Sequence, residues 1–473
     1  MITEALHYEE WMSSGDALMW HIERDPLLRS TVTAIWVLDR VPDLDLFVTA
    51  VGRAVEVVPR LRQRAAADRY GIAPPRWESD PNFDMSYHVR RERLCGDGSL
   101  RELLDHAAPI AVQAFDRDRP LWEYHLVDGV EKDRSALIMK VHHAISDGMG
   151  MVRMMLSLVD FEREPKRNAE HDEDAALYQG ASRSDLLHLQ DALLFRANSA
   201  ATRAVRWMRA YGQNVGQFVA HPFETSSKWS ATAASIGRLL KPATEPLSPL
   251  MNERSLNARL DVLKYPLDDL KKAAKVVQGT LNDAFVGGVT GGLRLYHEHF
   301  GMPVDDLRMN MPINIREGES SNSSSNQFVP ARFLVPISIE DPVDRMLTLH
   351  ELVQEQRAEP ALPLIDEVQA VIGGLGPRLA TTVAGSMLKA LDFVTSNVPG
   401  PPVPLYIAGA RIEETYPFGP LAGAATNVTL FSYNKTVHIG FNTDRAAVEE
   451  PELFMECMRK GFDEIIAVGR RSE

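Results

Sequence analysis

The stretch with the clearest chemical potential carries two adjacent histidines, His142 and His143, followed by Asp147 and Gly148. Histidine has an unperturbed pKa near neutral pH, so His143 can take a proton from a hydroxyl group and return it to a leaving group. Asp147 can fix the geometry of the turn or the tautomer of a ring, and Gly148 leaves room for backbone or substrate. The stretch predicts a general base at His143, with His142 in a structural role.

A histidine-rich turn that an aspartate merely stabilises is the alternative interpretation, because a bare His-x-x-x-Asp spacing is common by chance. The flanking sequence favours the interpretation of His143 as a general base. Residues 136–141 form a short apolar run typical of a buried strand. Residues 149–161 are almost wholly apolar, with their few polar positions on one helical face. The motif is therefore expected at a rigid turn between a core strand and a core helix.

Length and composition indicate an ordinary globular protein. The 473 residues leave room for two or three domain-sized units, and 45% are hydrophobic and 25% charged. A formal net charge of -14 argues against a nucleic-acid partner, although it does not exclude a local basic patch that meets a membrane. Cys95 and Cys457 are not spaced like metal ligands or redox pairs, so we expect a reducing cytoplasm and two packing cysteines.

Nothing in the sequence predicts export or membrane insertion. Residues 1–10 are polar and acidic, without the apolar core of a signal peptide. No apolar run is long enough to span a bilayer. If the protein handles lipid, we expect it to do so from the membrane surface.

The first part of the chain alternates helices and strands, as in a layered α/β domain that we place at residues 1–165. Helices are expected at 14–23, 44–58 and 100–107, and strands at 31–38, around Trp77, and at 86–90, 122–127 and 136–141.

Residues 166–255 are expected to form a helical linker between two domains. Charged residues dominate 162–174, residues 186–219 form a long helical region that carries several arginines, and 221–249 read as loop. A basic amphipathic helix can lie on a membrane. It can equally pack between two domains with its arginines in solvent, so both interpretations stay open.

A second α/β unit is placed at residues 256–473. Helices are expected at 264–277, from 281 onward, at 344–357 and at 451–468; strands at 307–315, 328–339 and 393–398; and a hairpin at 428–433 and 437–442. Glycines paired four residues apart in the helix after 281 predict close packing against a neighbour. Asn282 and Asp283 can cap that helix. A Ser/Asn-rich loop covers 318–327.

Several other chemistries find no support in the sequence. There is no Gly-x-Ser-x-Gly elbow of a serine hydrolase, no Walker-type loop and no complete Gly-x-Gly-x-x-Gly. The His-Glu-His at 297–299 has the wrong spacing for a zinc protease helix and is interpreted as surface. We therefore predict no metal and no nucleotide cofactor.

Six short segments together resemble bacterial wax ester synthase/diacylglycerol acyltransferases, in the order found in that family. They are Arg-Pro-Leu-Trp-Glu at 119–123, His-His-Ala-Ile-Ser-Asp-Gly at 142–148, Asn-Asp at 282–283, Met-Pro-Ile-Asn-Ile-Arg at 311–316, Asn-Val-Pro-Gly-Pro at 397–401 and Ser-Tyr at 432–433. The resemblance runs from about residue 14 to the last helix. The His-His-x-x-x-Asp-Gly element alone also marks chloramphenicol-acetyltransferase-like enzymes and condensation domains. Gly15 and Ser325 depart from the usual pattern, which affects local loop geometry only.

The resemblance implies an α/β fold of two chloramphenicol-acetyltransferase-like lobes, with His143 in a tunnel at their interface. Acyl-CoA, a co-substrate and not a cofactor, would reach it from one side and an acceptor alcohol from the other. His143 would deprotonate the hydroxyl and then protonate the departing CoA thiolate, without a covalent enzyme intermediate. Asn282 would stabilise the oxyanion, Asp147 would hold the turn, and His142, Gly148 and Asp283 would support the site.

The resemblance also implies roles for two further sets of residues in the matched motifs. Pro120, Leu121 and Trp122 would shape the wall of the acyl channel, although ordinary core packing explains them about as well. Asn397, Pro399 and Gly400 would have a structural role near the interface.

The family spans long-chain fatty alcohols and diacylglycerol as acceptors, and diacylglycerol, giving triacylglycerol, is the preferred expectation. A condensation-type enzyme that uses a carrier-protein thioester is one alternative. A non-catalytic lipid-droplet-binding protein is another, in which residues 186–219 would do the binding. We expect a cytoplasmic protein, peripheral on the inner membrane face or on lipid droplets.

Overall fold

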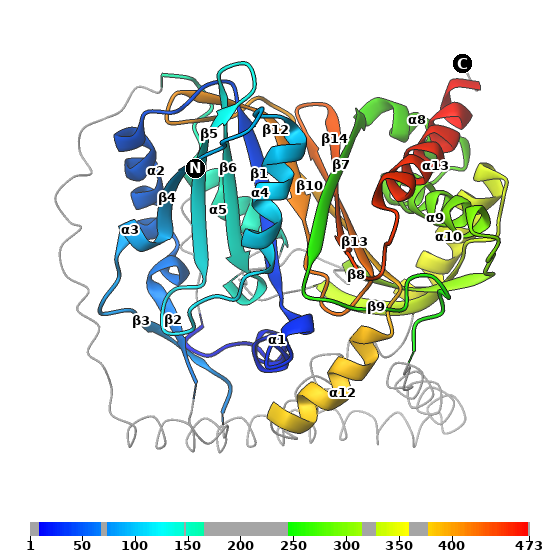
Figure 1. Cartoon of the computed structure of the whole chain (residues 1–473), viewed down its shortest axis with the longest axis horizontal. Coiled ribbons are helices and arrows are strands. Elements are labelled where there is room, and N and C mark those ends of the chain that lie inside the picture. Colours follow the sequence, from blue (N-terminus) through cyan, green and yellow to red (C-terminus); the bar gives the residue numbers. More distant parts are fainter. Residues whose placement is uncertain are drawn as a thin grey trace, which may run out of the picture.

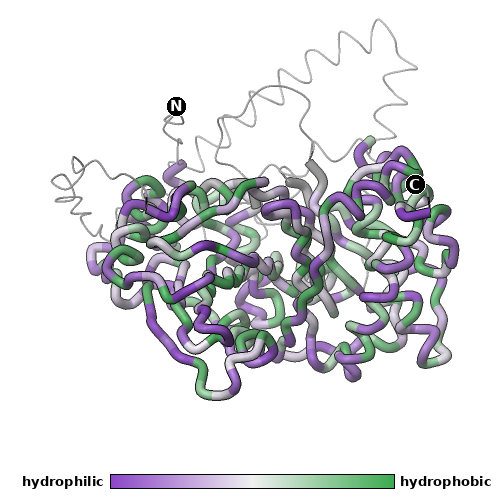
Figure 2. The backbone as a smooth tube through the Cα atoms, turned by 90° about the horizontal axis from the view of Figure 1, so that it is seen from above, coloured by the Kyte–Doolittle hydropathy of each residue, from purple (hydrophilic) through white to green (hydrophobic). Residues whose placement is uncertain are grey.

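The computed structural model describes residues 9–67, 73–145, 148–164, 245–314, 328–358 and 377–471. These residues form two lobes side by side, each with a six-stranded sheet and helices against it (Figure 1). Seen from a second direction, hydrophobic and hydrophilic residues alternate along most of the described elements (Figure 2).

The first lobe is built on a sheet with the strand order β11-β12-β1-β6-β5-β4. Its strands from the N-terminal half are β1 (Thr31–Leu38), β4 (Val89–Arg93), β5 (Trp122–Val130) and β6 (Arg134–His142). The helices of this lobe are α1 (Ser14–Ile22), α2 (Leu44–Val57), α3 (Met85–His88), α4 (Leu100–Val112) and α5 (Gly148–Leu158). A two-stranded ribbon of β2 (Gln63–Ala66) and β3 (Arg76–Ser79) completes it.

Side-chain alternation along β6 separates the two faces of this sheet. Leu137, Met139 and Val141 pack in the cluster that contains residues of α2 and α5. Ile138 packs in the opposite cluster, with residues of α4. Successive side chains of a strand point to opposite faces, so His142, at the end of β6, belongs to the α4 face.

The second lobe has the strand order β7-β14-β13-β10-β8-β9. Its strands are β7 (Ala258–Pro266), β8 (Asp306–Asn314), β9 (Phe328–Pro336), β10 (Phe393–Pro399), β13 (Thr426–Tyr433) and β14 (Thr436–Asp444). Four helices pack against the sheet on the side away from the first lobe (Figure 1): α8 (Leu267–Val276), α9 (Leu281–His299), α10 (Pro342–Arg357) and α13 (Pro451–Arg471).

The glycines of α9 allow the close helix packing that their spacing predicted. A Cβ atom on Gly288 would lie 2.5 Å from Cδ1 of Phe462 in α13. Conversely, a Cβ on Gly461 of α13 would lie 2.4 Å from the carbonyl oxygen of Gly288. The two backbones approach so closely that larger residues cannot be accommodated at either position without a shift.

Two strands from the C-terminal half cross into the first lobe. β11 (Tyr406–Ile407) and β12 (Ala410–Phe418) belong to the first sheet, where β12 pairs antiparallel with β1. Residues 406–418, which the sequence assigned to a C-terminal lobe of 256–473, are therefore part of the first sheet. Strand periodicity does not reveal which distant strand is the partner. The division of the chain into an N-terminal lobe, a linker and a C-terminal lobe at residues 165 and 255 remains a prediction.

A few predicted elements need correction. Instead of one strand at 86–90, the one-turn helix α3 is capped by Asp84 and leads into β4. The helix expected from residue 264 starts only at Leu267, because Lys264 and Tyr265 pair with β14. α4 continues past residue 107 through Pro109 to Val112. α12 (Pro377–Lys389), which lies beside α1 below both sheets in Figure 1, was not predicted.

Other elements confirm the sequence-based expectations. β1 spans the predicted residues, and the hairpin of β13 and β14 turns at Asn434 and Lys435, whose φ angles are +45° and +67°. Positive φ at both central residues is the geometry that matches the twist of two paired strands. The predicted helix at 186–219 and the loop at 318–327 lie outside the described residues. Within the described part, no helix is long and apolar enough to cross a bilayer.

Candidate functional site

His143 lies where the sequence placed it, at the turn between a core strand and a core helix. β6 ends at His142, the single 3-10 turn η3 (His143–Ile145) follows, and α5 starts at Gly148. The His143 side chain is half-buried, and its backbone N–H donates a hydrogen bond of 2.9 Å to the carbonyl of Ser30. Asp147, the other predicted member of this turn, lies outside the described residues.

Both ring nitrogens of His142 lie close to a polar group. Its side chain is 1% exposed, and its Nδ1 accepts a hydrogen bond of 3.0 Å from the backbone N–H of Ala144. Its Nε2 lies 3.0 Å from Oε1 of Glu23. The edges of Trp20 and Phe115 enclose the ring, with centroids at 6.0 and 6.2 Å. These contacts fit the supporting role expected of His142.

The residues that follow His143 are part of the large apolar cluster of the first lobe. Ala144 and Ile145 belong to an apolar cluster that also contains Phe431 and Tyr433 of β13. The Tyr433 hydroxyl reaches across to the first sheet, where it donates a hydrogen bond of 2.9 Å to the carbonyl of Ile412. Ile412 pairs with Leu38, at the end of β1 remote from His142. At the other end Thr31, which pairs with His142, lines a pocket together with Arg254 and Asp444 of the second lobe, so the histidine turn lies near the contact between the two lobes.

Asp283 has a clear structural function at the start of α9. Its Oδ2 accepts hydrogen bonds from the backbone N–H of Thr280 at 2.7 Å and from Nδ1 of His350 at 2.9 Å, and its side chain is 2% exposed. It closes a capping box that satisfies the first turn of the helix. His350 was not singled out from the sequence, because it lies 67 residues further along the chain.

Asn282, the neighbour of Asp283, makes weaker side-chain contacts. Its side chain is half-buried, and its Nδ2 lies 3.5 Å from the sulfur of Met311. Thioether sulfur is a weak acceptor, so the amide retains capacity to donate a stronger hydrogen bond. This is the property that an oxyanion-stabilising group needs.

Leu121 and Trp122 belong to the core of the first lobe. Both side chains are fully buried, and Pro120 is buried beside them. The Trp122 indole N–H donates to the carbonyl of Leu61 at 2.8 Å, and its ring stacks on His88 with a centroid distance of 4.4 Å. Of the two interpretations that the sequence left open, the structure favours core packing over a channel wall for Leu121 and Trp122.

Gly400 lies at the end of β10, where this strand approaches β13 closely. A Cβ atom on Gly400 would lie 2.3 Å from the carbonyl oxygen of Ser432, and its N–H donates to the Ser432 hydroxyl at 3.2 Å. Asn397 and Pro399 belong to the same strand and pair with Leu430 and Ser432 of β13. The surroundings of all three fit a structural role.

A buried polar cluster next to the turn was not predicted. Lys140 of β6 is fully buried, with its Nζ 3.7 Å from Oε2 of Glu123 in β5. The same oxygen lies 3.5 Å from Nε2 of His125 and 3.6 Å from a guanidinium nitrogen of Arg90. Burial lowers the pKa of Lys140 to about 8. The sequence signal that could have revealed this cluster is the presence of charged residues, Lys140 and Glu123, within two strands of the core.

A metal site was not expected, and no group of three His, Cys, Asp or Glu side chains among the described residues could hold a metal ion. One correction concerns His297, which the sequence placed on the surface. It is fully buried, and its Nε2 lies 2.8 Å from the Ser248 hydroxyl. His299 is exposed, as expected.

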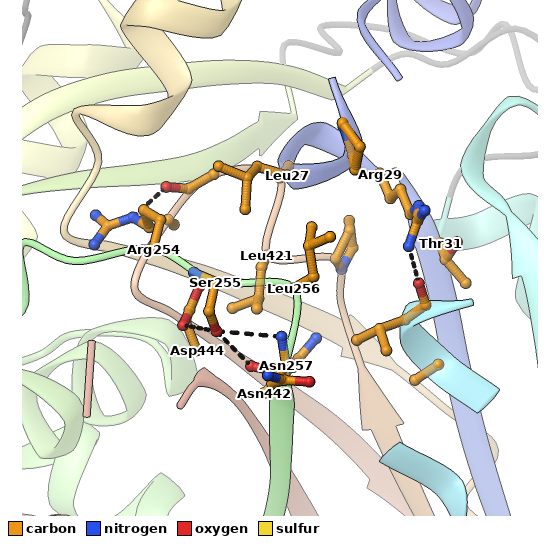
Figure 3. Close-up of a pocket in the computed structure, with 17 residues that line it drawn as sticks. Leu27, Arg29, Thr31, Arg254, Ser255, Leu256, Asn257, Leu421, Asn442 and Asp444 are labelled. Carbon is orange, nitrogen blue, oxygen red and sulfur yellow. Dashed lines mark hydrogen bonds between the residues drawn. The ribbon is translucent and has the colours of Figure 1, made fainter. Parts of the chain in front are cut away.

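A small pocket of about 50 Å³ lies between the lobes (Figure 3). Leu27, Arg29 and Thr31 line it from the first lobe. Arg254, on the other side, already donates hydrogen bonds to several backbone carbonyls, including those of Gly423, Met251 and Leu391. Arg29 donates to the carbonyl of Val112. Both guanidinium groups therefore hold loops in place.

Comparison with known proteins shows to which family the chain belongs. Residues 12–285 match the family described as wax ester synthase/diacylglycerol acyltransferase catalytic domain, and residues 324–466 match the WS/DGAT C-terminal domain. A putative diacylglycerol O-acyltransferase of Mycobacterium tuberculosis is 37% identical over 458 residues, which cover 96% of this chain and 91% of that protein. The chain belongs to this family. A second relative in that species, a probable diacylglycerol O-acyltransferase, is 24% identical and covers 91% of this chain and 89% of its own.

Solved structures of the same architecture show the fold. The wax ester synthase/diacylglycerol acyltransferase from Marinobacter aquaeolei VT8 superposes with a TM-score of 0.62 at 20% identity, covering 97% of this chain and 98% of that one. The first condensation domain of the calcium-dependent antibiotic synthetase has a TM-score of 0.59 at 15% identity, covering 98% and 96%. The predicted family, the two-lobed α/β fold and the acyltransferase class are confirmed.

Proposed function

We propose that this acyltransferase moves a long-chain acyl group from acyl-CoA to the free hydroxyl of diacylglycerol and so forms triacylglycerol, with long-chain fatty alcohols as a second class of acceptor. The observation that carries the proposal is the half-buried His143, on a rigid strand-turn-helix unit near the contact between two lobes. The names of the relatives, diacylglycerol O-acyltransferases, support this choice of acceptor.

The chemistry that we assign to His143 is general acid–base catalysis. Its imidazole takes the proton of the acceptor hydroxyl as that oxygen attacks the thioester carbonyl. When the tetrahedral intermediate collapses, the carbon–sulfur bond breaks, and the imidazolium returns the proton to the CoA thiolate. Protons balance over the cycle, and no bond between enzyme and acyl group is needed. The acyl-CoA is consumed as co-substrate, without a further cofactor.

The remaining residues of the proposed site assist this step. The Asn282 amide donates a hydrogen bond to the oxyanion of the tetrahedral intermediate. His142 supports the turn from inside the first lobe, and we assign Asp147 and Gly148 a supporting role as well. Asp283 serves by holding the first turn of α9, on which Asn282 is carried.

Activity assays with the purified protein test the proposal. We expect radiolabelled palmitoyl-CoA with diolein to give triacylglycerol and with hexadecanol to give wax ester. His143→Ala should form both products at least about 100-fold more slowly, whereas His299→Ala, at an exposed histidine of α9, should keep the parent rate. Activity only with an acyl-carrier-protein thioester would point to a condensation-type enzyme. Lipid binding without ester formation from any pair would point to a droplet-binding protein and refute the proposal.

We further propose that the protein works in the cytoplasm, peripherally on the inner membrane face or on lipid droplets, since its acceptors partition there. Co-sedimentation with liposomes that contain diolein should recover the protein with the lipid. Recovery in the supernatant, with and without diolein, would contradict this part of the proposal.

A further inference from the structure

Glu23 stands directly behind the histidine turn. It is the C-terminal cap of α1, and its side chain is only 11% exposed. One of its oxygens, Oε1, accepts the backbone N–H of Ser30 at 2.6 Å and lies 3.0 Å from Nε2 of His142. Two groups from different segments of the chain therefore converge on a single carboxylate oxygen.

The contacts of His142 fix which of its nitrogens is protonated. Nδ1 accepts the backbone N–H of Ala144 at 3.0 Å, so this nitrogen carries a lone pair and no proton. In the neutral ring the proton must then be on Nε2, which lies 3.0 Å from the negatively charged Oε1 of Glu23, close enough for electrostatic attraction although the pair is not aligned as a hydrogen bond. An acceptor at this place holds that tautomer, as a partner on one ring nitrogen generally does.

The same carboxylate also reaches His143 through the backbone. The N–H of Ser30 donates to Glu23, and the carbonyl of Ser30 accepts the N–H of His143 at 2.9 Å. Glu23 thus contacts His142 through its side chain and restrains His143 through Ser30. A displacement of the turn would have to break at least one of these hydrogen bonds.

A third residue keeps the carboxylate in place. Nη2 of Arg117 lies 3.5 Å from Oε2 of Glu23, donates to the Trp20 carbonyl at 3.1 Å, and the guanidinium stacks over the Trp20 ring at 4.1 Å. Burial raises the pKa of Glu23, but the contacts with His142, Ser30 and Arg117 outweigh it and leave the pKa below its ordinary value. The group is a carboxylate at neutral pH.

We propose that Glu23 is a positioning residue for the acyl transfer: it holds His142 in the Nε2-protonated tautomer and, through Ser30, fixes the backbone from which His143 acts. The inference rests on the proposed function, because the activity that it serves is the one assigned to His143. Glu23 itself touches neither substrate nor reacting atoms.

Two substitutions distinguish the role of Glu23 as a hydrogen-bond acceptor from its role as a negative charge. Glu23→Ala removes Oε1 and should lower kcat about 10- to 100-fold with the KM for acyl-CoA unchanged, since small displacements of a catalytic group cost this much. Glu23→Gln keeps one acceptor oxygen for both Ser30 and His142 and should stay within a few-fold of the parent. Equal losses in the two variants would overturn the proposal.

Glu92→Ala is the matched control. Glu92 also binds a buried histidine of the first lobe, with its Oε1 2.6 Å from Nδ1 of His125, and its other oxygen contacts His106 at the same distance. It lies on β4, which β5 separates from β6 and its histidine turn. We expect Glu92→Ala to keep the parent kcat; a loss as large as that of Glu23→Ala would contradict a specific role for Glu23.

A second measurement needs no substrate. In protein labelled with ¹⁵N at histidine rings, the His142 signal, assigned by its loss in His142→Gln, should show a protonated Nε2 and an unprotonated Nδ1. In Glu23→Ala, where the turn loses its restraint through Ser30 and Nδ1 is no longer held against the Ala144 N–H, both tautomers should appear. A parent ring protonated on Nδ1, or an unchanged ring in Glu23→Ala, would overturn the inference. Absence of ester formation by the parent would refute the proposed function alone.

Discussion

Gly440 and Pro417 approach each other so closely that a Cβ atom at position 440 would lie 1.7 Å from the Pro417 carbonyl oxygen. Gly440 belongs to β14 of the second sheet, and Pro417 to β12, which pairs with β1 in the first. This contact joins the backbones of the two lobes. His143 and Asn282 lie on opposite lobes, so their relative placement depends on it.

Gly440→Ala should therefore disturb both stability and activity. The added methyl group meets backbone, which cannot rotate away, and we expect a loss of about 3 kcal/mol in the free energy of unfolding together with a lower kcat. Urea unfolding of the two proteins measures the difference. Gly52→Ala, in helix α2 where nothing lies within 4 Å of the added atom, should instead be neutral or stabilise by up to about 1 kcal/mol. Similar midpoints for parent and Gly440→Ala would be inconsistent with the contact.

Substitution of two neighbouring residues should separate chemistry from folding in α9. We expect Asn282→Ala to lower kcat about 100- to 1000-fold, the usual cost of a lost oxyanion donor, with an unchanged urea midpoint. Asp283→Ala should lower the midpoint, because it leaves the capping box open and removes the partner of His350. Full activity in Asn282→Ala would remove Asn282 from the proposed mechanism.

Stability should decrease in acid partly because of His438 in β14. Its side chain is 2% exposed and faces Tyr416 of β12, and burial lowers its pKa to about 4. Between pH 6.5 and 4 the unfolded chain binds a proton that the folded protein does not, so stability falls as the pH falls through this range. The contribution is roughly 3 kcal/mol, from about 1.4 kcal/mol for each pH unit.

The matched variant for this effect is His438→Gln, which cannot take up the proton. From pH 6.5 down to pH 4 the free energy of unfolding of the parent should fall relative to that of the variant. Above pH 7 the difference between the two proteins should be constant. A difference that is constant across the whole range would show that His438 is not responsible.

Much of the fold could be predicted because its signals are local. The β-branched run at Thr31–Leu38, the Asn434–Lys435 turn and the paired glycines of α9 each depend on neighbours in sequence or on one helix face. The strand-turn-helix unit around His143 was predictable for the same reason. These features need no knowledge of distant partners.

The features that were missed depend on partners far along the chain. The strand β12 was not predicted, and its place beside β1 is set by residues far apart in the chain, such as Leu38 and Ile412. Glu23, at the end of a short helix, looks like a solvent-exposed charge until His142 is placed next to it. Leu121 and Trp122 suit a channel wall or a core equally well on sequence alone, and their complete burial could not be predicted from it.

The most direct test of the account is a single-turnover measurement with labelled palmitoyl-CoA and diolein on the parent and on His143→Ala. The account predicts that both proteins bind acyl-CoA with similar affinity, while triacylglycerol formation in the variant is slower by about 100- to 10,000-fold, the contribution of a general base. Triacylglycerol formation at the parent rate in His143→Ala would contradict it.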